Sequence, residues 1–128
     1  VYRTQPFAKK KLEAAVIQNT ELHAQGKLGV ATLSLEQMQR IGAAEEDTEG
    51  VIDHIRNVET VEIAIFIRES AEGKSRANLR SKEDWDVAKL AAQFGGGGHP
   101  HAAGISMDED LAAARQKLMA AALDLLEG

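Results

Sequence analysis

The sequence predicts a single α/β domain with a central mixed β-sheet flanked by helices. Residues 61–68 (VEIAIFIR) form a short, almost continuous apolar run rich in isoleucine, which is typical of a central strand. Further along, Val87, Leu90, Ala91 and Phe94 follow the i, i+3, i+4, i+7 spacing of a half-buried helix. A length of 128 residues, with 44% hydrophobic and 27% charged residues, suits one domain around one core.

The first part of the chain alternates helix and strand patterns. An amphipathic helix is predicted over residues 5–23, and a strand with β-branched residues over 28–34. Ser34 followed by Gln37 is a capping-box pattern, so we expect a short helix that stops near Gly42.

Two further helix starts are predicted from cap residues. Thr48, in an acidic stretch that reads as a loop or a helix start, is a candidate N-cap, and Ser106 with Glu109 should cap the last helix. The apolar residues expected to face the core are Val51, Ile52 and Ile55 in the first of these helices and Leu111, Ala114, Leu118, Ala121 and Leu125 in the second.

The segments around the helix that begins near Val87 predict a hairpin and another strand. Glu72-Gly73 is a turn pattern, and residues 74–82 should return as the hairpin partner of the central strand. Gly95 is placed to end the helix in a left-handed conformation. Residues 102–107 are predicted to form a strand.

Composition and charge exclude several classes of protein. The net charge of −5 disfavours a broad basic surface for long nucleic acids, so an anionic ligand would need a local pocket. The chain has no cysteine, which excludes disulfides and thiolate metal sites and fits a cytoplasmic protein. No apolar run approaches the length of a membrane span, so we expect no membrane partner.

The strongest functional pattern is GGGGHPHAAG, which begins at Gly95. Four consecutive glycines are entropically costly to order, and a fold keeps them where a ligand must approach the backbone closely. Consecutive backbone N–H groups can form a nest for an anion, and a neighbouring histidine can donate a hydrogen bond to phosphate. A flexible loop with an incidental histidine is the alternative. The candidate binding residues are Gly96, Gly97, Gly98 and His99.

A second candidate group follows from the alternation of side chains along residues 74–82. Arg76, Asn78 and Arg80 would share one face, where they could bind a phosphate or a base edge, with arginine binding bidentately. A solvated edge face is the alternative, and the glycine-rich segment nearby favours binding. A β-bulge would turn Ser81 toward the same site, which makes it an additional candidate.

Four other residues have useful side chains in weaker patterns. Asp53 and His54 are consecutive on a predicted helix, so they do not face each other, and we predict no metal site there. His101 either shares the site of His99 or borders it. Trp85 should cover the adjacent helix, with stacking on a base as the alternative.

The motif NLRS, from Asn78 to Ser81, and the run WDVAKLAAQFGGGGHPHAAG, from Trp85, resemble the C-terminal associated domain of DHH phosphoesterases. The resemblance covers essentially the whole chain and includes DTEG at residues 47–50. It is closest to the branch of nano-RNases and 3′-phosphoadenosine 5′-phosphate phosphatases. The resemblance implies that residues 1–128 are the substrate-binding domain of a longer protein and that an N-terminal catalytic DHH domain lies outside them.

The resemblance also implies roles for individual residues. In that family the glycine-rich segment, the histidine after it and the strand arginine bind the phosphate and base of the substrate. These roles fall on Gly96, Gly97, Gly98, His99 and Arg80, and on Asn78, where relatives often carry serine.

The reaction implied by the resemblance is two-metal hydrolysis of short oligoribonucleotides or nucleoside bisphosphates. Two manganese ions would belong to the N-terminal domain, and none of the family's metal motifs occurs in this chain. We therefore expect the chain to hold no cofactor of its own and to bind substrate without hydrolysing it.

Three alternatives stay open. A cyclic-dinucleotide phosphodiesterase or a single-strand exonuclease of the same superfamily would use a similar substrate domain, although the exonuclease would need a more basic path. A non-catalytic module like the C-terminal domain of alanyl-tRNA synthetases shares a glycine-rich segment but usually follows it with lysine, where this chain has His99. The preferred substrate and a homodimer of the full-length protein are also left open.

Overall fold

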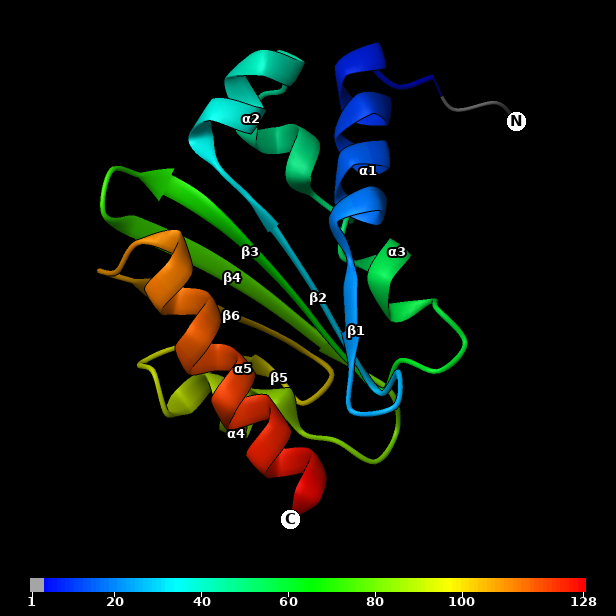
Figure 1. Cartoon of the computed structure of the whole chain (residues 1–128), viewed down its shortest axis with the longest axis vertical. Coiled ribbons are helices and arrows are strands. Elements are labelled where there is room, and N and C mark those ends of the chain that lie inside the picture. Colours follow the sequence, from blue (N-terminus) through cyan, green and yellow to red (C-terminus); the bar gives the residue numbers. More distant parts are fainter. Residues whose placement is uncertain (1–3) are drawn as a thin grey trace.

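In the part of the chain that the structure describes, six β-strands form one mixed sheet with helices on both faces (Figure 1). In the computed structural model, which describes residues 4–128, the strand order is β1-β2-β3-β4-β6-β5. β2 and β3 run parallel, and all other neighbours are antiparallel. The strands are β1 (Glu21–His23), β2 (Leu28–Leu33), β3 (Ile63–Ala71), β4 (Lys74–Ser81), β5 (Gly97–His99) and β6 (Ala102–Met107). The predicted single α/β domain with a central mixed sheet is confirmed.

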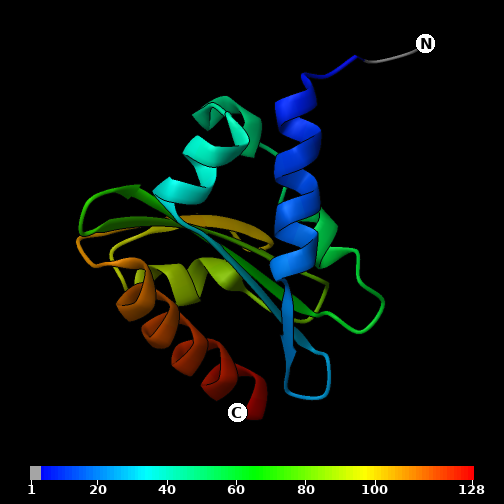
Figure 2. The same cartoon turned by 45° about the horizontal axis from the view of Figure 1, so that its top comes forward.

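The first helical layer covers one half of one sheet face (Figure 2). It consists of α1 (Phe7–Asn19), α2 (Leu35–Ile41), the 3-10 helix η1 (Glu45–Thr48) and α3 (Asp53–Arg56). Leu12 of α1, Ile55 of α3 and Phe66 of β3 pack in its apolar core. α1 lies over β2, α2 over β3, and α3 reaches from β2 to β4. Side chains of this face on β4, β6 and β5 are consequently exposed or half-buried.

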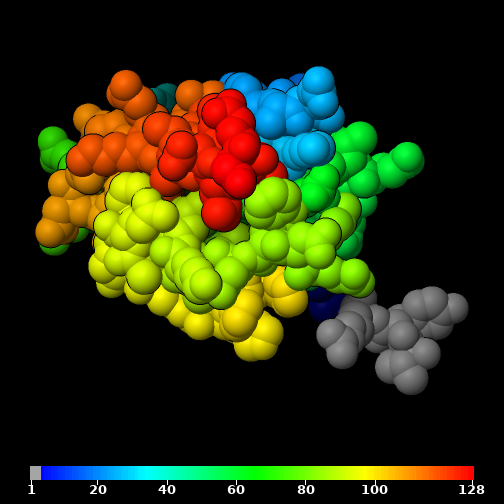
Figure 3. Space-filling model, turned by 90° about the horizontal axis from the view of Figure 1, so that it is seen from below, coloured from blue at the N-terminus to red at the C-terminus, as the bar shows by residue number. Residues whose placement is uncertain are grey.

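The second helical layer covers the opposite face. It consists of α4 (Val87–Ala92) and α5 (Leu111–Glu127). Leu90 of α4 and Leu118 of α5 pack with Leu79 of β4 in a separate apolar core. α5 also reaches the edge of the sheet, where Arg115 pairs with Glu21 of β1; Figure 3 shows the orange and red residues of α5 beside the light-blue hairpin of β1 and β2. Within residues 4–128, no helix combines the length and apolar character needed to cross a bilayer.

The first helix is shorter than the predicted range of residues 5–23. It ends at Asn19, and Glu21–His23 form the edge strand β1, which pairs with β2. The turn between the two strands has positive φ angles at Ala24 (54°) and Gln25 (59°). The backbone groups of residues 21–23 form their hydrogen bonds with β2, and not within a helix. The helical pattern is confined to residues 5–23 and does not include this pairing partner.

Two of the three predicted helix caps are wrong. Ser34 and Gln37 form the predicted capping box. Thr48 lies inside η1, where its hydroxyl donates to a carbonyl of the preceding turn at 2.6 Å, so it does not cap α3. Ser106 lies in β6, and the N-cap of α5 is Asp110, whose carboxylate accepts from the backbone N–H three residues on at 2.8 Å. A carboxylate there also complements the helix dipole.

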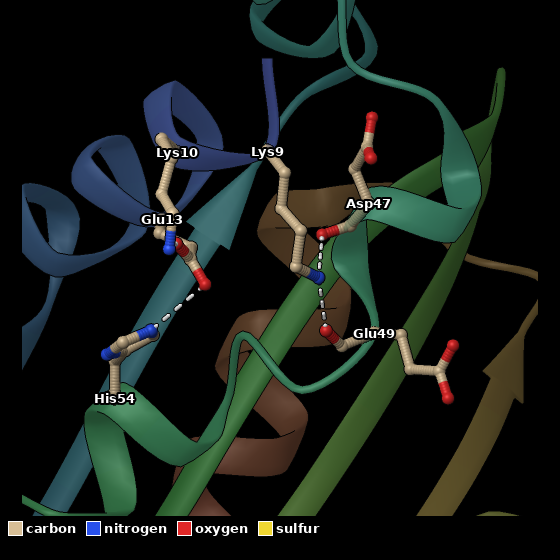
Figure 4. Close-up of polar contacts among 6 residues, drawn as sticks. All are labelled: Lys9, Lys10, Glu13, Asp47, Glu49 and His54. Atoms are coloured by element: carbon tan, nitrogen blue, oxygen red, sulfur yellow. Dashed lines mark hydrogen bonds and ion pairs between the residues drawn. The ribbon is translucent and has the colours of Figure 1, made fainter. Parts of the chain in front are cut away.

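Polar contacts hold the segment that leads into α3 against α1 (Figure 4). The Lys9 ammonium donates to two backbone carbonyls of residues 47–50, at 3.1 and 2.7 Å. The Glu13 carboxylate lies 3.2 Å from Nε2 of His54. Burial alone would raise the pKa of Glu13, but hydrogen bonds from His54 and Lys10 bring that pKa below its ordinary value. These contacts fix the position of α3, which borders the uncovered part of the sheet.

The assignment of the α5 cap can be tested by substitution. Asp110→Ala removes the carboxylate that accepts from the first turn of α5, so the free energy of unfolding should fall by about 1 kcal/mol. Ser106→Ala is the matched control, because Ser106 is exposed on β6, and its effect should stay within about 0.5 kcal/mol. Urea unfolding followed by circular dichroism measures both values. A larger loss in Ser106→Ala than in Asp110→Ala would contradict the assignment.

Candidate functional site

The pleat of β4 separates its side chains into two groups, as predicted. Arg76, Asn78 and Arg80 lie on the sheet face that the first helical layer leaves open. Arg76 is exposed, and the other two are half-buried. The opposite face of β4 is buried and consists of Ser75, Ala77, Leu79 and Ser81.

Ser81 does not reach the open face. A β-bulge beside it would be needed for that, but β4 has none there, and the register shift of this hairpin lies between Glu69 and Ala71 of β3. The Ser81 side chain is buried, and its hydroxyl donates to the carbonyl of Trp85 at 2.6 Å. The carbonyl of Pro100 is a second, longer acceptor at 3.3 Å. Ser81 therefore ties together the segments beneath the site.

The glycine-rich segment forms a strand where the sequence predicts an open nest. Gly95, with φ of 80°, terminates the turn after α4, as expected. Gly97–His99 then form β5, which pairs antiparallel with β6 at the edge of the sheet. N–H groups alternate in direction along a strand, so they do not converge on one anion in the manner of a nest.

Two of the glycines are required by the close approach of this strand to β6. A Cβ atom on Gly96 would lie 2.3 Å from the carbonyl oxygen of Gly104, and one on Gly98 would lie 2.6 Å from that of Ala102. A Cβ atom on Gly97 would meet nothing within 4 Å. Gly96 and Gly98 therefore allow tight strand packing, and Gly97 faces open space.

The strand register brings the remaining candidates to one face. Arg80 pairs with Ala102 of β6, which pairs with His99 of β5. In the adjacent row, Asn78 pairs with Gly104, which pairs with Gly97. Neighbouring strands lie about 4.8 Å apart, so the backbones of β4 and β5 flank a strip about 10 Å wide. Its floor, β6, has only small residues in these two rows, which leaves space for a ligand.

Arg80 is partly held in place and partly free to bind. One Nη atom donates to the carbonyl of Leu79 at 3.0 Å, and Nε lies 4.0 Å from the carboxylate of Asp53 on α3. A quarter of its side chain (25%) is exposed. The guanidinium has five N–H donors, so these contacts leave donors for an anion.

The hydrogen bonds of His99 indicate which ring nitrogen faces solvent as a donor. The backbone N–H of His101 donates to Nδ1 of His99 at 3.3 Å. A ring nitrogen that accepts a hydrogen bond carries no proton, so the neutral ring carries its proton on Nε2. Because the side chain is exposed, that Nε2–H is available to an oxygen of a ligand. The ring of His101 lies beside it, with 6.0 Å between the ring centroids.

Comparison with known proteins identifies the domain. Residues 24–128 match the DHHA1 domain family. The chain belongs to this family. The match confirms the resemblance to the domain associated with DHH phosphoesterases, and it includes all the candidate binding residues, from Arg76 to His99.

Relatives of this DHHA1 domain are found in longer bacterial proteins. The chain is 32% identical over 100 residues to a probable bifunctional oligoribonuclease and PAP phosphatase from Streptococcus mutans, and 31% identical over 97 residues to a bifunctional oligoribonuclease and PAP phosphatase from Thermus thermophilus. The matches cover 77% and 76% of this chain but 31% and 28% of those proteins, so the chain spans about a third of their length.

A solved structure shares the fold of the DHHA1 domain. An exopolyphosphatase-related protein from Bacteroides fragilis superposes with a TM-score of 0.84 and 24% sequence identity. The match covers 99% of this chain and 36% of that one. The six-stranded sheet and its two helical layers are therefore a known arrangement.

Asp53 and His54, which are consecutive on α3, contact different neighbours in the structure. Asp53 lies 3.5 Å from Arg56 and 4.0 Å from Arg80, and His54 faces α1. Among residues 4–128, no group of three or more histidine and carboxylate side chains is arranged to hold a metal ion.

Asp53 is the residue of this site that sequence reasoning missed. Its proximity to Arg80 results from the packing of α3 against the β2–β4 part of the sheet. No periodicity or spacing in the sequence links the two residues, because they lie on different elements far apart in the chain. The charge of Arg80 was recognised, but its partner was not.

The structural role of the glycines can be tested by two substitutions. Gly96→Ala places Cβ against a backbone carbonyl, so the free energy of unfolding should fall by about 1–3 kcal/mol. Gly97→Ala is the matched control, because its Cβ meets nothing within 4 Å, and it should change stability by less than about 1 kcal/mol. Thermal and urea unfolding measure both. Equal stability of the two variants would show that β5 does not pack against β6 as described.

Proposed function

We propose that this DHHA1 domain binds the substrate of a phosphoesterase that hydrolyses short oligoribonucleotides or nucleoside bisphosphates. The observation that carries the proposal is the open strip of the sheet, where Arg80 and His99 flank the small residues of β6. The two relatives, whose names describe oligoribonuclease and PAP phosphatase activities, support this choice of substrate.

In this proposal the strip binds and orients a phosphate group. Arg80 donates two parallel hydrogen bonds to the phosphate oxygens, and Nε2–H of His99 donates a third from the opposite side. Asn78 adds a donor and an acceptor one row away on the same face. Gly97 and Gly104 let the substrate approach the backbone closely. Holding the phosphate in one orientation reduces the entropic part of the barrier to hydrolysis.

Bond cleavage itself is assigned to another part of the protein. We propose an N-terminal DHH domain whose two manganese ions would activate water, and this chain would present the substrate to it. The residues described here bind the phosphate, and their net positive charge at the strip balances the charge of the substrate. This division of labour makes the DHH domain the principal partner of the chain.

Binding should depend on both Arg80 and His99. Alanine at either position removes a charge-assisted hydrogen bond, so substrate binding should weaken by about 1–3 kcal/mol, with the fold intact because both side chains lie on the open face. Calorimetric titration of a dinucleotide measures the loss. The matched control is Arg40→Ala, which removes an exposed arginine of α2 that pairs with Glu36. If both residues bind one phosphate, the double variant loses less than the sum of the single losses. Wild-type affinity in both single variants would contradict the site.

The length of the substrate is a separate prediction. A chain with a net charge of −5 and a single basic strip offers few charges for a long phosphate backbone. In a protein that contains this domain and its catalytic partner, kcat/KM should be higher for a dinucleotide than for a single strand of about 20 nucleotides. Steady-state kinetics on both substrates with manganese measures the ratio. Faster turnover of the long strand would favour an exonuclease and contradict the proposal.

A further inference from the structure

A cavity of about 560 Å³ lies beside the phosphate-binding strip, and no role has been assigned to it so far. Arg56, Glu62, Trp85 and His101 line its wall. We infer that it binds the nucleoside part of a nucleotide whose phosphate lies between Arg80 and His99. The inference rests on the proposed function and adds to it a second subsite, which would decide between substrates that share the same phosphate.

Trp85 is held in a fixed position at the cavity. Its side chain packs against the apolar core beneath α4 and α5, and Trp85 also lines the cavity. Its Nε1–H donates to the Glu62 carboxylate at 2.7 Å, and its carbonyl accepts from Ser81 at 2.6 Å. A ring that is fixed before binding loses little conformational entropy when a base stacks on it. Stacking on an aromatic side chain is accessible to every base, because each has a π face.

Glu62 supplies the polar contact that the inference requires. One carboxylate oxygen accepts from Trp85, and a carboxylate has about four lone-pair sites in total. The remaining sites can accept from N–H groups of a base or from hydroxyls of a ribose. In both cases the nucleoside supplies the hydrogen-bond donor and Glu62 accepts.

The charges around the cavity favour the uncharged part of a nucleotide. Three carboxylates line it, from Glu62, Glu83 and Asp84, against two permanent cations, from Arg56 and Lys82. Lys82 is already engaged, since its ammonium donates to the carbonyl of Val58 at 3.1 Å. A phosphate would therefore be disfavoured inside the cavity and favoured on the strip. This distribution gives the bound nucleotide one orientation.

Two chains of contacts connect the cavity with the strip. Asp53 lies 3.5 Å from Arg56 in the cavity wall and 4.0 Å from Arg80 on the strip. His101, which lines the cavity, lies next to His99, with 6.0 Å between the ring centroids. The two subsites are thus adjacent, as the phosphate and nucleoside of one ligand must be.

Fluorescence gives a direct test, because Trp85 is the only tryptophan in the sequence. The 128-residue chain is titrated with GMP, AMP, 2′-deoxy-GMP, guanosine and inorganic phosphate. We expect saturable quenching by the three nucleotides and by guanosine, and none by phosphate, which should instead compete with the nucleotides. Calorimetry in parallel shows the concentration at which each nucleotide saturates the chain. If Trp85 emission is unchanged at saturation with every nucleotide, the inference is overturned.

Variants separate the subsite from the proposed function. Arg80→Ala should weaken the binding of GMP about tenfold and leave the affinity for guanosine unchanged. If Arg80→Ala weakens GMP although no ligand quenches Trp85, the proposed function stands and the cavity does not bind the nucleoside. If guanosine quenches Trp85 but Arg80→Ala has no effect on GMP, the cavity binds nucleosides and the proposed phosphate site fails.

Glu62→Gln tests the polar contact without removing the support of Trp85, because glutamine keeps one oxygen to accept from Nε1–H. We expect GMP to bind about fivefold more weakly to this variant. If the variant loses affinity for GMP and 2′-deoxy-GMP but not for AMP, the donor to Glu62 is on the base. If it loses affinity for GMP and AMP but not for 2′-deoxy-GMP, the donor is the 2′-hydroxyl of the ribose. Unchanged affinity for all three would exclude Glu62 from the subsite. Trp85→Leu should weaken the binding of all three nucleotides about tenfold, as measured by calorimetry.

Discussion

The two-sided pattern of β4 is the constraint on which the rest of the structure depends. β4 is hydrogen-bonded to β3 on one side and to β6 on the other. Its register therefore determines which side chains of these neighbouring strands lie on each face of the sheet. One set of its side chains enters the apolar core beneath α4 and α5, and the alternate set must then face outward. A one-residue slip would bury Arg80 and expose Leu79. Core packing and the orientation of Arg80 and Asn78 are therefore one and the same requirement.

The open strip exists because the two helical layers cover unequal parts of the sheet. The layer of α1, α2 and α3 covers β2 and β3 and extends no further than β4, whereas α4 and α5 support β4 and β6 from behind. The strip is thus backed by a rigid core while its front stays accessible. Local positive charge from Arg80 can act there although the chain as a whole is acidic. Such an arrangement suits a small anion better than a long polyanion.

Contacts around α3 and Trp85 hold the border of the strip. Lys9 and Glu13 of α1 fix the segment that carries Asp53, and Asp53 lies near both Arg80 and Arg56. On the other side of the cavity, Glu62 and Ser81 hold Trp85 in place. Most of these contacts are hydrogen bonds and ion pairs between segments distant in sequence, and they hold the side chains in place without a ligand. Pre-ordered side chains reduce the entropic cost of binding.

The sequence alone determined the elements whose causes are local. The apolar run before Arg68, the capping box of Ser34 and Gln37 and the alternation along β4 each depend on residues that are neighbours in the chain. Those patterns were sufficient to predict the α/β class and to place Arg80 and Asn78 on one face, and the glycine-rich segment made His99 a candidate. What only the tertiary structure decided depends on partners distant in sequence. β1 and β5 are strands because β2 and β6 pair with them, Gly96 and Gly98 are glycines because β6 passes so close, and Asp53 meets Arg80 because α3 packs across the sheet. Pairing and packing energies of this kind arise between segments, so no pattern within one segment contains them.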